Sequence, residues 1–150
     1  MANKKIWLGI LVMVLVFGMT VVGCASLFSR TPKSFQKGSG GDTTILLRDG
    51  LDYNQAFREV DFAIRKHGFE VETITPEVGY LRTQWSYTWN DTGKTLEAYR
   101  VRIICNFNPS RTQLIVKAEA EYLQRGEWVQ GFDTRAISTL RTDLTNAVGN

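Results

Sequence analysis

Residues that bind metal ions or form disulfide bonds are scarce in this chain of 150 residues, which has two cysteines and one histidine. A structural zinc site takes four ligands, and Cys24, Cys105 and His67 supply too few of them. Cys105 lies in an apolar strand pattern, so we expect it to be a small residue of the core. The alternative, a reactive thiol, requires a positive and partly exposed setting. We therefore expect no metal and no cofactor.

The chain also lacks the short motifs of common enzyme classes. It has no G-x-S-x-G nucleophile elbow, no H-E-x-x-H zinc motif, no Walker loop and no Rossmann glycine fingerprint. The glycine-rich run Lys37–Gly41 precedes a predicted strand rather than a helix, so we do not expect it to hold a phosphate group. The remaining acidic residues are scattered over solvent positions and helix caps. The sequence therefore predicts a protein that is not an enzyme.

The predicted folded part of the chain has no excess of positive charge. The whole sequence carries a formal charge of +3, but five of its basic residues precede Thr43. From Thr43 onward, 13 lysines and arginines stand against 14 aspartates and glutamates, a net charge of −1. Nucleic-acid-binding domains concentrate positive charge on one surface. The charge distribution therefore argues against a nucleic-acid partner.

Residues 1–23 have the three parts of a secretory signal peptide. Two lysines give a positive start, Ile6–Val22 is apolar except for Thr20, and the small residue Gly23 stands before Cys24. About 20 apolar residues also suffice to cross a bilayer, so an uncleaved membrane anchor is the alternative. In either case we expect the residues after Cys24 to lie outside the cytoplasm.

The sequence VVGC at residues 21–24 resembles the lipobox of bacterial lipoproteins. The resemblance implies that residues 1–23 are removed and that Cys24, the new first residue, carries fatty acyl groups such as palmitate. Each buried methylene contributes about 0.8 kcal/mol and a single chain binds only marginally, so a lasting anchor needs two or three chains. The residue after the cysteine is Ala25 rather than Asp, which by the same resemblance implies an outer-membrane lipoprotein facing the periplasm.

The remaining chain divides into a tether and one domain. Residues 25–42 are rich in Ser, Gly and Lys and have no apolar period, so we assign residues 24–42 to a lipidated cysteine and a flexible tether. Eighteen such residues span roughly 20–25 Å on average. Their basic side chains either lie against lipid phosphates or are simply solvated. Residues 43–150 are enough for a single domain of ordinary size.

Hydrophobic periodicity predicts two helices and five strands in residues 43–150. Asp52 caps the first helix, which extends to about His67, and Asp133 or Thr134 caps the second. The predicted strands are 43–47, 69–75, 81–89, 99–107 and 114–122, with a further edge piece near Trp128. The order β-α-β-β-β-β-α predicts an α+β, two-layer sandwich, in which two helices pack on one face of a mostly antiparallel sheet.

Turn sequences between the predicted strands set their register. A three-residue loop at 91–93 places Leu81 opposite Ile103. A type I turn at 108–111 places Ile103 opposite Val116. In this register the apolar residues of all three strands share the face that the helices cover, and the other face is open.

The same register aligns three cations, Arg82, Arg102 and Lys117, across the open face of the sheet. Like charges directly opposite each other are destabilising. The row therefore suggests a site for an anion or an acidic partner. In the alternative, Glu119 and Glu121 neutralise the row diagonally, and the face is only solvated.

Two aromatic features are candidates for contacts. Phe62 points away from the apolar stripe of its helix, so it is either an ordinary exposed aromatic residue or an anchor for a partner. Trp85, Tyr87 and Trp89 share one face of their predicted strand, a pattern that favours the core over a binding platform. Trp89 is nearest to the hairpin tip, so we expect it to be the most exposed of the three.

Residues 79–85 read GYLRTQW, a G-x-L-x-T-x-W run that resembles BamC-type (NlpB) outer-membrane lipoprotein domains. The resemblance implies a helix-on-sheet domain behind a tether, with a non-enzymatic accessory role in an assembly complex. BamC-type proteins have two such domains and this chain has one. Two hypotheses follow: a lipid-anchored protein-interaction module of the cell envelope, or a lipoprotein that binds a small ligand or a polymer on its open sheet face.

Overall fold

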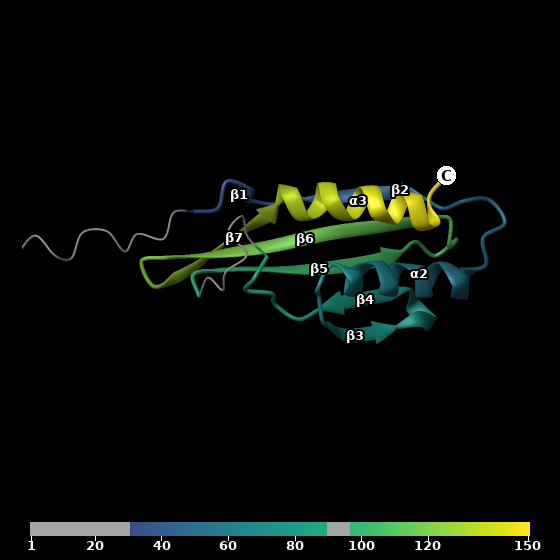
Figure 1. Cartoon of the computed structure of the whole chain (residues 1–150), viewed down its shortest axis with the longest axis horizontal. Coiled ribbons are helices and arrows are strands. Elements are labelled where there is room, and N and C mark those ends of the chain that lie inside the picture. Colours follow the sequence, from purple (N-terminus) through teal and green to yellow (C-terminus); the bar gives the residue numbers. More distant parts are fainter. Residues whose placement is uncertain (1–30, 90–96) are drawn as a thin grey trace, which may run out of the picture. The chain divides into compact units, whose positions relative to one another are not determined.

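The computed structural model describes residues 31–89 and 97–150. Cys24 and the predicted loop at 91–93 lie outside the described residues. The strands are β1 (Phe35–Lys37), β2 (Asp42–Leu46), β3 (Val71–Thr75), β4 (Tyr80–Thr83), β5 (Tyr99–Phe107), β6 (Gln113–Gln124) and β7 (Glu127–Asp133). The helices are α2 (Tyr53–Lys66), the 3-10 helix η1 (Pro76–Val78) and α3 (Thr134–Val148) (Figure 1).

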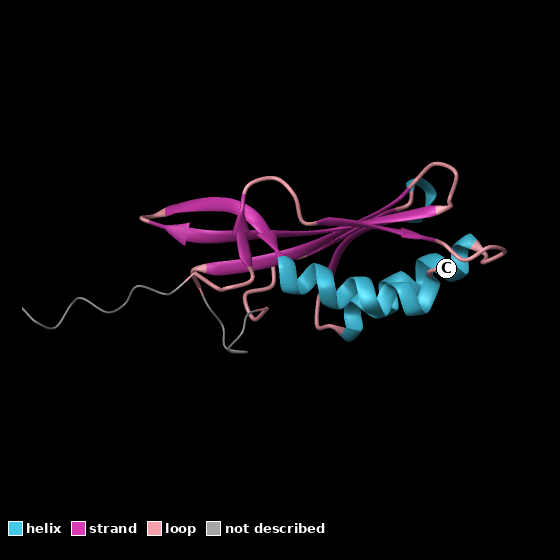
Figure 2. Cartoon of the chain, turned by 90° about the horizontal axis from the view of Figure 1, so that it is seen from above, coloured by secondary structure: helices cyan, strands magenta, loops and turns pink. Residues whose placement is uncertain are grey.

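The chain folds as an α+β sandwich of two layers, as the sequence predicted. The sheet is antiparallel with the order β1-β7-β6-β5-β4-β3, and β2 also pairs with β6. Both α-helices lie on one side of the sheet (Figure 2). Compared with the prediction, β1 is an additional strand. The piece near Trp128 is also a full strand, because β7 pairs with β6 on one side and with β1 on the other.

The helices form where capping and apolar spacing agree. The side chain of Asp52 accepts a hydrogen bond from the Gln55 backbone N–H (3.0 Å), which caps α2 as predicted. Asp133 caps α3 in the same way through the Ala136 N–H (2.7 Å). The buried face of each helix packs on alternate residues of β5 and β6, all at most 5% exposed: Tyr99, Val101, Ile103, Cys105, Phe107, Leu114, Val116, Ala118 and Ala120.

The long strand β6 is shared by two partners along one edge. β7 pairs with its second half, from Glu119 to Gln124, and β2 pairs with its first half, from Gln113 to Lys117. The chain therefore passes from β1, beside β7, to β2, beside β6, through the short segment Gly38–Gly41. The glycine-rich segment therefore lies where β1 gives way to β2, against β6 and β7, to which Gly41 and Gly38 are hydrogen-bonded.

The tether prediction was wrong for its second half, because the folded domain already includes Ser34. The Ser34 hydroxyl is buried and donates to Asp133 Oδ2 (2.8 Å), and β1 pairs with β7 from Phe35 to Lys37. The Phe35 ring packs edge-on against Tyr99, with 6.0 Å between ring centroids. A single apolar residue among polar ones gives no periodic signal, so only its distant partners reveal this strand.

The glycines after β1 are required by a close approach rather than by tether flexibility. Gly40 and Gly41 have backbone φ angles of 152° and 70°, which residues other than glycine rarely adopt. A Cβ at Gly41 would lie 2.2 Å from the Cβ of Phe132. The segment therefore passes directly over Phe132, and the Gly41 carbonyl accepts a hydrogen bond from the Ala118 N–H (3.1 Å).

The predicted strand register is wrong by two residues in both hairpins. Leu81 lies opposite Cys105, and Ile103 lies opposite Ala118. In the second hairpin the turn is longer than the predicted one, since Asn108 lies opposite Gln113. A shift of two residues leaves each side chain on its predicted face but changes its partner across the strands.

The long strand predicted at 81–89 ends at Thr83, and this places its aromatic residues differently. After Thr83 the backbone pairs with β5 again at Ser86, which lies opposite Val101 in an isolated bridge. Trp85 lies on the open face against Arg100 and Arg102, so its placement in the core was wrong. Trp89 is half-buried and packs on Phe69 with 5.0 Å between ring centroids. Trp85 and Tyr87 are half-buried as well, so the expectation that Trp89 is the most exposed of the three is not confirmed.

Candidate functional site

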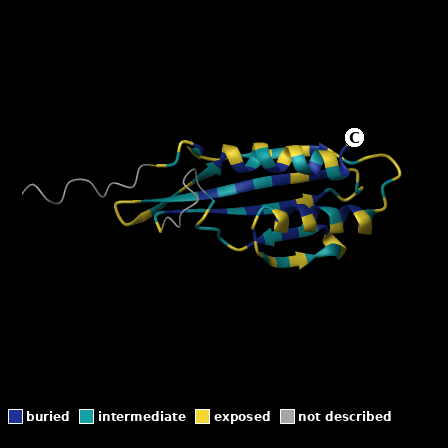
Figure 3. Ribbon diagram, viewed as in Figure 1, coloured by how far each residue is buried: buried dark blue, intermediate teal, exposed yellow. Residues whose placement is uncertain are grey.

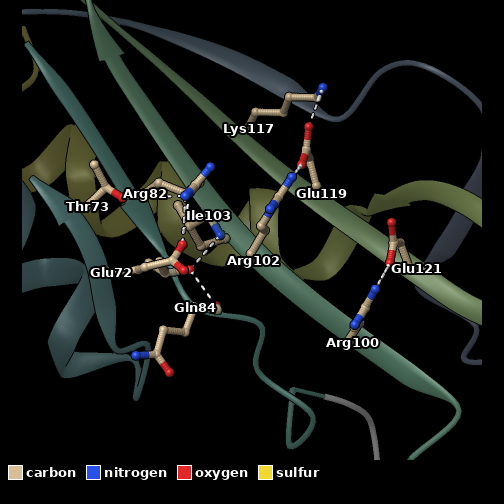
Figure 4. Close-up of polar contacts among 11 residues, drawn as sticks. Glu72, Thr73, Arg82, Gln84, Arg100, Arg102, Ile103, Lys117, Glu119 and Glu121 are labelled. Carbon is tan, nitrogen blue, oxygen red and sulfur yellow. Dashed lines mark hydrogen bonds and ion pairs between the residues drawn. The ribbon is translucent and has the colours of Figure 1, made fainter.

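The three cations of the predicted row lie on the open face but are not opposite one another, and each has a carboxylate partner (Figure 4). Arg102 lies opposite Glu119, with 2.7 Å between Nη2 and Oε2. Lys117 reaches the other oxygen of Glu119 at 2.9 Å. Arg82 lies opposite Ile104, rather than opposite Arg102, and pairs with Glu72 at 2.9 Å. The three cations are therefore neutralised: Arg102 by the residue directly opposite, Lys117 by the same Glu119 on its own strand, and Arg82 by Glu72 of β3. The basis for an anion site on these cations is lost.

Glu119 is the common partner of two of these cations. Burial is the largest single effect on the pKa of Glu119, and it raises this pKa. The hydrogen bonds from Lys117 and Arg102 and the positive charges of both groups lower the pKa, and together they outweigh burial. The pKa of Glu119 is therefore below its ordinary value. The carboxylate stays ionised at neutral pH and holds both cations in place.

A stack of aromatic and guanidinium groups lies beside these pairs and joins three segments of the sheet. The Arg100 guanidinium lies 4.1 Å from the ring centroid of Trp128, on β7, and 4.6 Å from that of Trp85. Arg102 lies 4.4 Å from the Trp85 ring. Cation–π contacts of this kind contribute about 0.5–1 kcal/mol at exposed sites and more where water is excluded. We refer to Trp85, Arg100, Arg102 and Trp128 as the tryptophan–arginine stack.

Arg100 is held by polar contacts as well. Its Nε donates to Glu121 (2.8 Å), which lies directly opposite on β6, and its Nη1 donates to the Tyr87 hydroxyl (3.3 Å). Burial lowers the pKa of Arg100, but these hydrogen bonds outweigh it and raise the pKa further above its ordinary value. The stack therefore remains cationic and ordered. Sequence reasoning missed it because Trp85 and Trp128 are far apart in the chain and become neighbours only through β5 and β6.

The open face is hollowed next to the stack. A hollow of about 380 Å³ is bordered by Trp85, Arg102, Lys117, Glu119 and Gln130, and by the segment Gly38–Gly40. Ligand-binding pockets typically measure about 300–1,000 Å³. One wall thus comes from residues that the sequence assigned to a tether.

The helix layer carries the second candidate surface. Phe62 is 67% exposed, as predicted from its position on α2. It borders a hollow of about 310 Å³ between α2 and α3, together with Lys66, Asp143 and Asn146. Asp143 on α3 pairs with Nε2 of His67, the residue that ends α2, at 2.8 Å, so the two helices are joined beside this hollow.

Cys105 is a core residue, as predicted. It is 0% exposed, and burial raises the pKa of its thiol well above the ordinary value, so it is unreactive in the folded state. The described residues contain no group of three or more His, Cys, Asp or Glu side chains placed to hold a metal ion. Within residues 31–89 and 97–150, no helix has the length and apolar character needed to span a membrane.

No protein-family model matches this chain, and no curated protein matches it in sequence. The resemblances to bacterial lipoproteins and to BamC-type domains therefore rest on the short motifs at residues 21–24 and 79–85 alone.

Proposed function

We propose that the protein is a lipid-anchored lipoprotein of the cell envelope whose domain is a non-enzymatic protein-interaction module, accessory to assembly or maintenance of the outer membrane. The observation that carries the proposal is Cys24, which follows a positive start, an apolar run and the residues VVG. Acyl groups on that cysteine would hold the domain at a membrane surface.

The start of the domain at Ser34 makes the proposed anchor short. Only nine residues lie between Cys24 and Ser34, whose hydroxyl is buried, so ten residue steps join them, fewer than in the tether expected from composition. Because a residue spans at most about 3.3–3.6 Å, this link can reach no more than about 36 Å in any conformation. A lipidated Cys24 would therefore keep the N-terminal end of the domain close to the membrane.

Metabolic labelling tests the anchor. Cells are grown with a palmitate analogue, and the protein and its Cys24→Ala variant are compared. We expect label and membrane fractionation for the unmodified protein and neither for the variant. Cys105→Ser is the matched control and should keep the label, since Cys105 is buried in the core. An unlabelled protein that still carries Met1 would refute the proposal.

Phe62 is the residue that we propose as the anchor of the protein contact. Exposed aromatic residues beside a hollow are typical of interface hot spots. The mixed charges around the hollow, Lys66 and Asp143, suit the polar rim of an interface. The exposed ring and the adjacent hollow together favour this surface over the neutralised cation row as the site of a protein contact.

Crosslinking in cells, followed by purification of the anchored protein, tests this contact. Phe62→Ser should lose a partner that the unmodified protein retains. Val78→Ser is a matched control, because Val78 is 68% exposed on η1, outside the hollow. If Phe62→Ser retains every partner and the combined change of Arg82, Arg102 and Lys117 to Ala loses one, the contact lies on the sheet.

The second candidate function is a lipoprotein that binds a small ligand or a polymer. The observation that favours it is the hollow on the open sheet face, which is large enough for a ligand and is lined by an aromatic ring and polar groups. The two candidates use opposite layers of the domain, so they can be tested separately.

A further inference from the structure

We propose that the hollow on the open sheet face binds a neutral saccharide, whose ring packs on Trp85. This inference deepens the second candidate function and does not depend on the lipid anchor or on Phe62. It rests on the composition of the walls, on their balance of charge and on the way the neighbouring contacts hold Trp85.

The walls present hydrogen-bond donors and acceptors in balanced numbers. Arg102 and Lys117 carry two positive charges, and Glu119 and Glu121 carry two negative charges. Gln130 adds an amide that both donates and accepts. A sugar hydroxyl also donates and accepts, so it can use the free positions of guanidinium, ammonium and carboxylate groups without changing their charge.

A charged ligand fits these walls less well. Glu119 already accepts from Arg102 (2.8 Å) and from Lys117 (2.9 Å), and Glu121 accepts from Arg100. An anion bound by Arg102 or Lys117 would lie beside the like charge of Glu119, and a cation bound by Glu119 would lie beside Arg102 and Lys117, unless it displaced one of these partners. Leaving a partly buried charge without its partner is costly. The ion pairs therefore favour a neutral ligand over a phosphate or an acidic peptide.

Trp85 supplies an aromatic surface for the apolar face of a sugar ring. An indole ring has a negative face that attracts the weakly positive C–H groups of such a ring. Contacts with Arg100 (4.6 Å) and Arg102 (4.4 Å) restrain the orientation of the indole before any ligand arrives. A restrained ring loses little conformational freedom on binding, which favours affinity.

The segment Gly38–Gly40 completes the site and is itself held in place. The Gly38 N–H donates to the Gln130 carbonyl (3.3 Å), and a Cβ at Gly40 would meet the Phe132 ring at 3.0 Å. The wall therefore lies close to the sheet, and Ser39, between these two glycines, borders the hollow. Trp85 also borders a second hollow of about 280 Å³, together with Glu70 and Gln84, so both hollows meet at this residue and a longer saccharide has room to extend beyond it.

Calorimetric titration of the full-length protein tests the proposal. The protein is purified in a detergent without a sugar head group, such as lauryldimethylamine oxide, and titrated with three neutral trisaccharides: triacetylchitotriose, cellotriose and maltotriose. We expect millimolar or tighter binding of at least one of the three. Trp85→Ala, which loses the aromatic contact, should bind that trisaccharide about tenfold more weakly.

Trp128→Ala is the matched control. It removes the other ring of the same stack, but Trp128 does not border the hollow. We expect its affinity to stay within about threefold of the unmodified protein. If Trp85→Ala fails to fold, as judged by its thermal melt, Gln130→Ala takes its place, because Gln130 is an exposed residue of the wall.

Three results would overturn the proposal: no heat with any trisaccharide at millimolar concentration, equal weakening by Trp85→Ala and Trp128→Ala, or binding that none of the variants changes. A protein that takes up the palmitate label at Cys24 but binds no sugar would refute the saccharide site and leave the lipoprotein proposal intact. A protein that binds sugar without carrying label would do the reverse.

Discussion

The two faces of the sheet are built from alternate residues of the same strands, and buried and partly exposed residues alternate along β6 (Figure 3). The two faces are stabilised in different ways. On the helix side, β5 and β6 present apolar residues that are almost completely buried, from Val101 and Ile103 to Val116. On the open side, the same strands present the pairs Arg100–Glu121 and Arg102–Glu119. Burial of apolar surface is non-directional, whereas these pairs depend on which residues lie opposite each other.

Asp133 and Glu119 are carboxylates that accept several hydrogen bonds on opposite faces of the sheet, and their donors differ. Asp133, on the helix side, is 0% exposed and accepts from Ser34, Tyr99 and the Ala136 N–H, which are all neutral donors. Glu119, on the open side, has a side chain that is 23% exposed and accepts from two cations. The carboxylate of Asp133 is therefore a structural link within the core, whereas that of Glu119 orders a surface that a ligand can reach.

Asp133→Ala should have the largest effect on stability. It leaves the buried Ser34 and Tyr99 hydroxyls without their acceptor and removes the cap of α3. We expect the free energy of unfolding to fall by about 3–5 kcal/mol. Urea unfolding followed by tryptophan fluorescence measures it. Ser34→Ala, which removes only one donor, should cost about 1 kcal/mol, and equal losses for the two variants would contradict the role given to the carboxylate.

Gly41→Ala tests whether the open face also contains a tightly packed point. The added Cβ must displace Phe132, and the residue has a φ of 70°, so we expect a loss of about 2–4 kcal/mol. Gly50→Ala is the matched control, because Gly50 has a φ of 74° but open space around it. It should cost only about 1 kcal/mol. Thermal and urea unfolding measure both losses of stability. Equal losses for Gly41→Ala and Gly50→Ala would mean that Phe132 does not obstruct the added Cβ.

Two double-mutant cycles separate the ion pairs of the open face by their exposure. Arg100–Glu121, with side chains 22% and 13% exposed, should show a coupling energy of about 1–2 kcal/mol. Arg82–Glu72, with side chains 34% and 47% exposed, should show less than about 0.5 kcal/mol. Alanine variants and urea unfolding give both coupling energies. A larger coupling energy for Arg82–Glu72 than for Arg100–Glu121 would contradict the expectation that the less exposed pair is the stronger one.

The smallest effect that we expect is a dependence on pH at Glu119. Its pKa is lower in the folded state than in the unfolded chain, so its contribution to stability is present at neutral pH and is lost as the pH falls through the acid range. The difference in unfolding free energy between the unmodified protein and Glu119→Gln should therefore shrink between pH 7 and about pH 3. Glu127→Gln, at the exposed start of β7, is the control for the loss of a carboxylate.

Local sequence signals predicted the elements well where a single segment carries the information. Asp52 caps α2 as predicted, β5 has its predicted bounds, and Cys105 is buried. Phe62 is exposed, because its helical angle alone puts it opposite the apolar stripe. These results depend on capping and periodicity, which act over a few residues.

Predictions that needed distant partners were less accurate. Ser34 lies in a polar segment, and only its hydrogen bond to Asp133 shows that it belongs to the domain. Trp85 continues an alternating pattern, yet the strand ends at Thr83 and the ring turns to the open face. The hollow could not be predicted, since it combines this displaced ring with Gly38–Gly40.

The amino-acid sequence by itself determined the helices, the faces of the central strands and the overall α+β class, because apolar periodicity and capping are local properties of the chain. Only the tertiary structure decided which residues lie opposite each other on the open face, where the domain begins and which groups surround the hollow. The physical reason is that a shift of two residues in register keeps every side chain on its own face of the sheet but gives each charged residue a new partner across the strands. The conformation of the loops in the folded domain decides which of these registers forms.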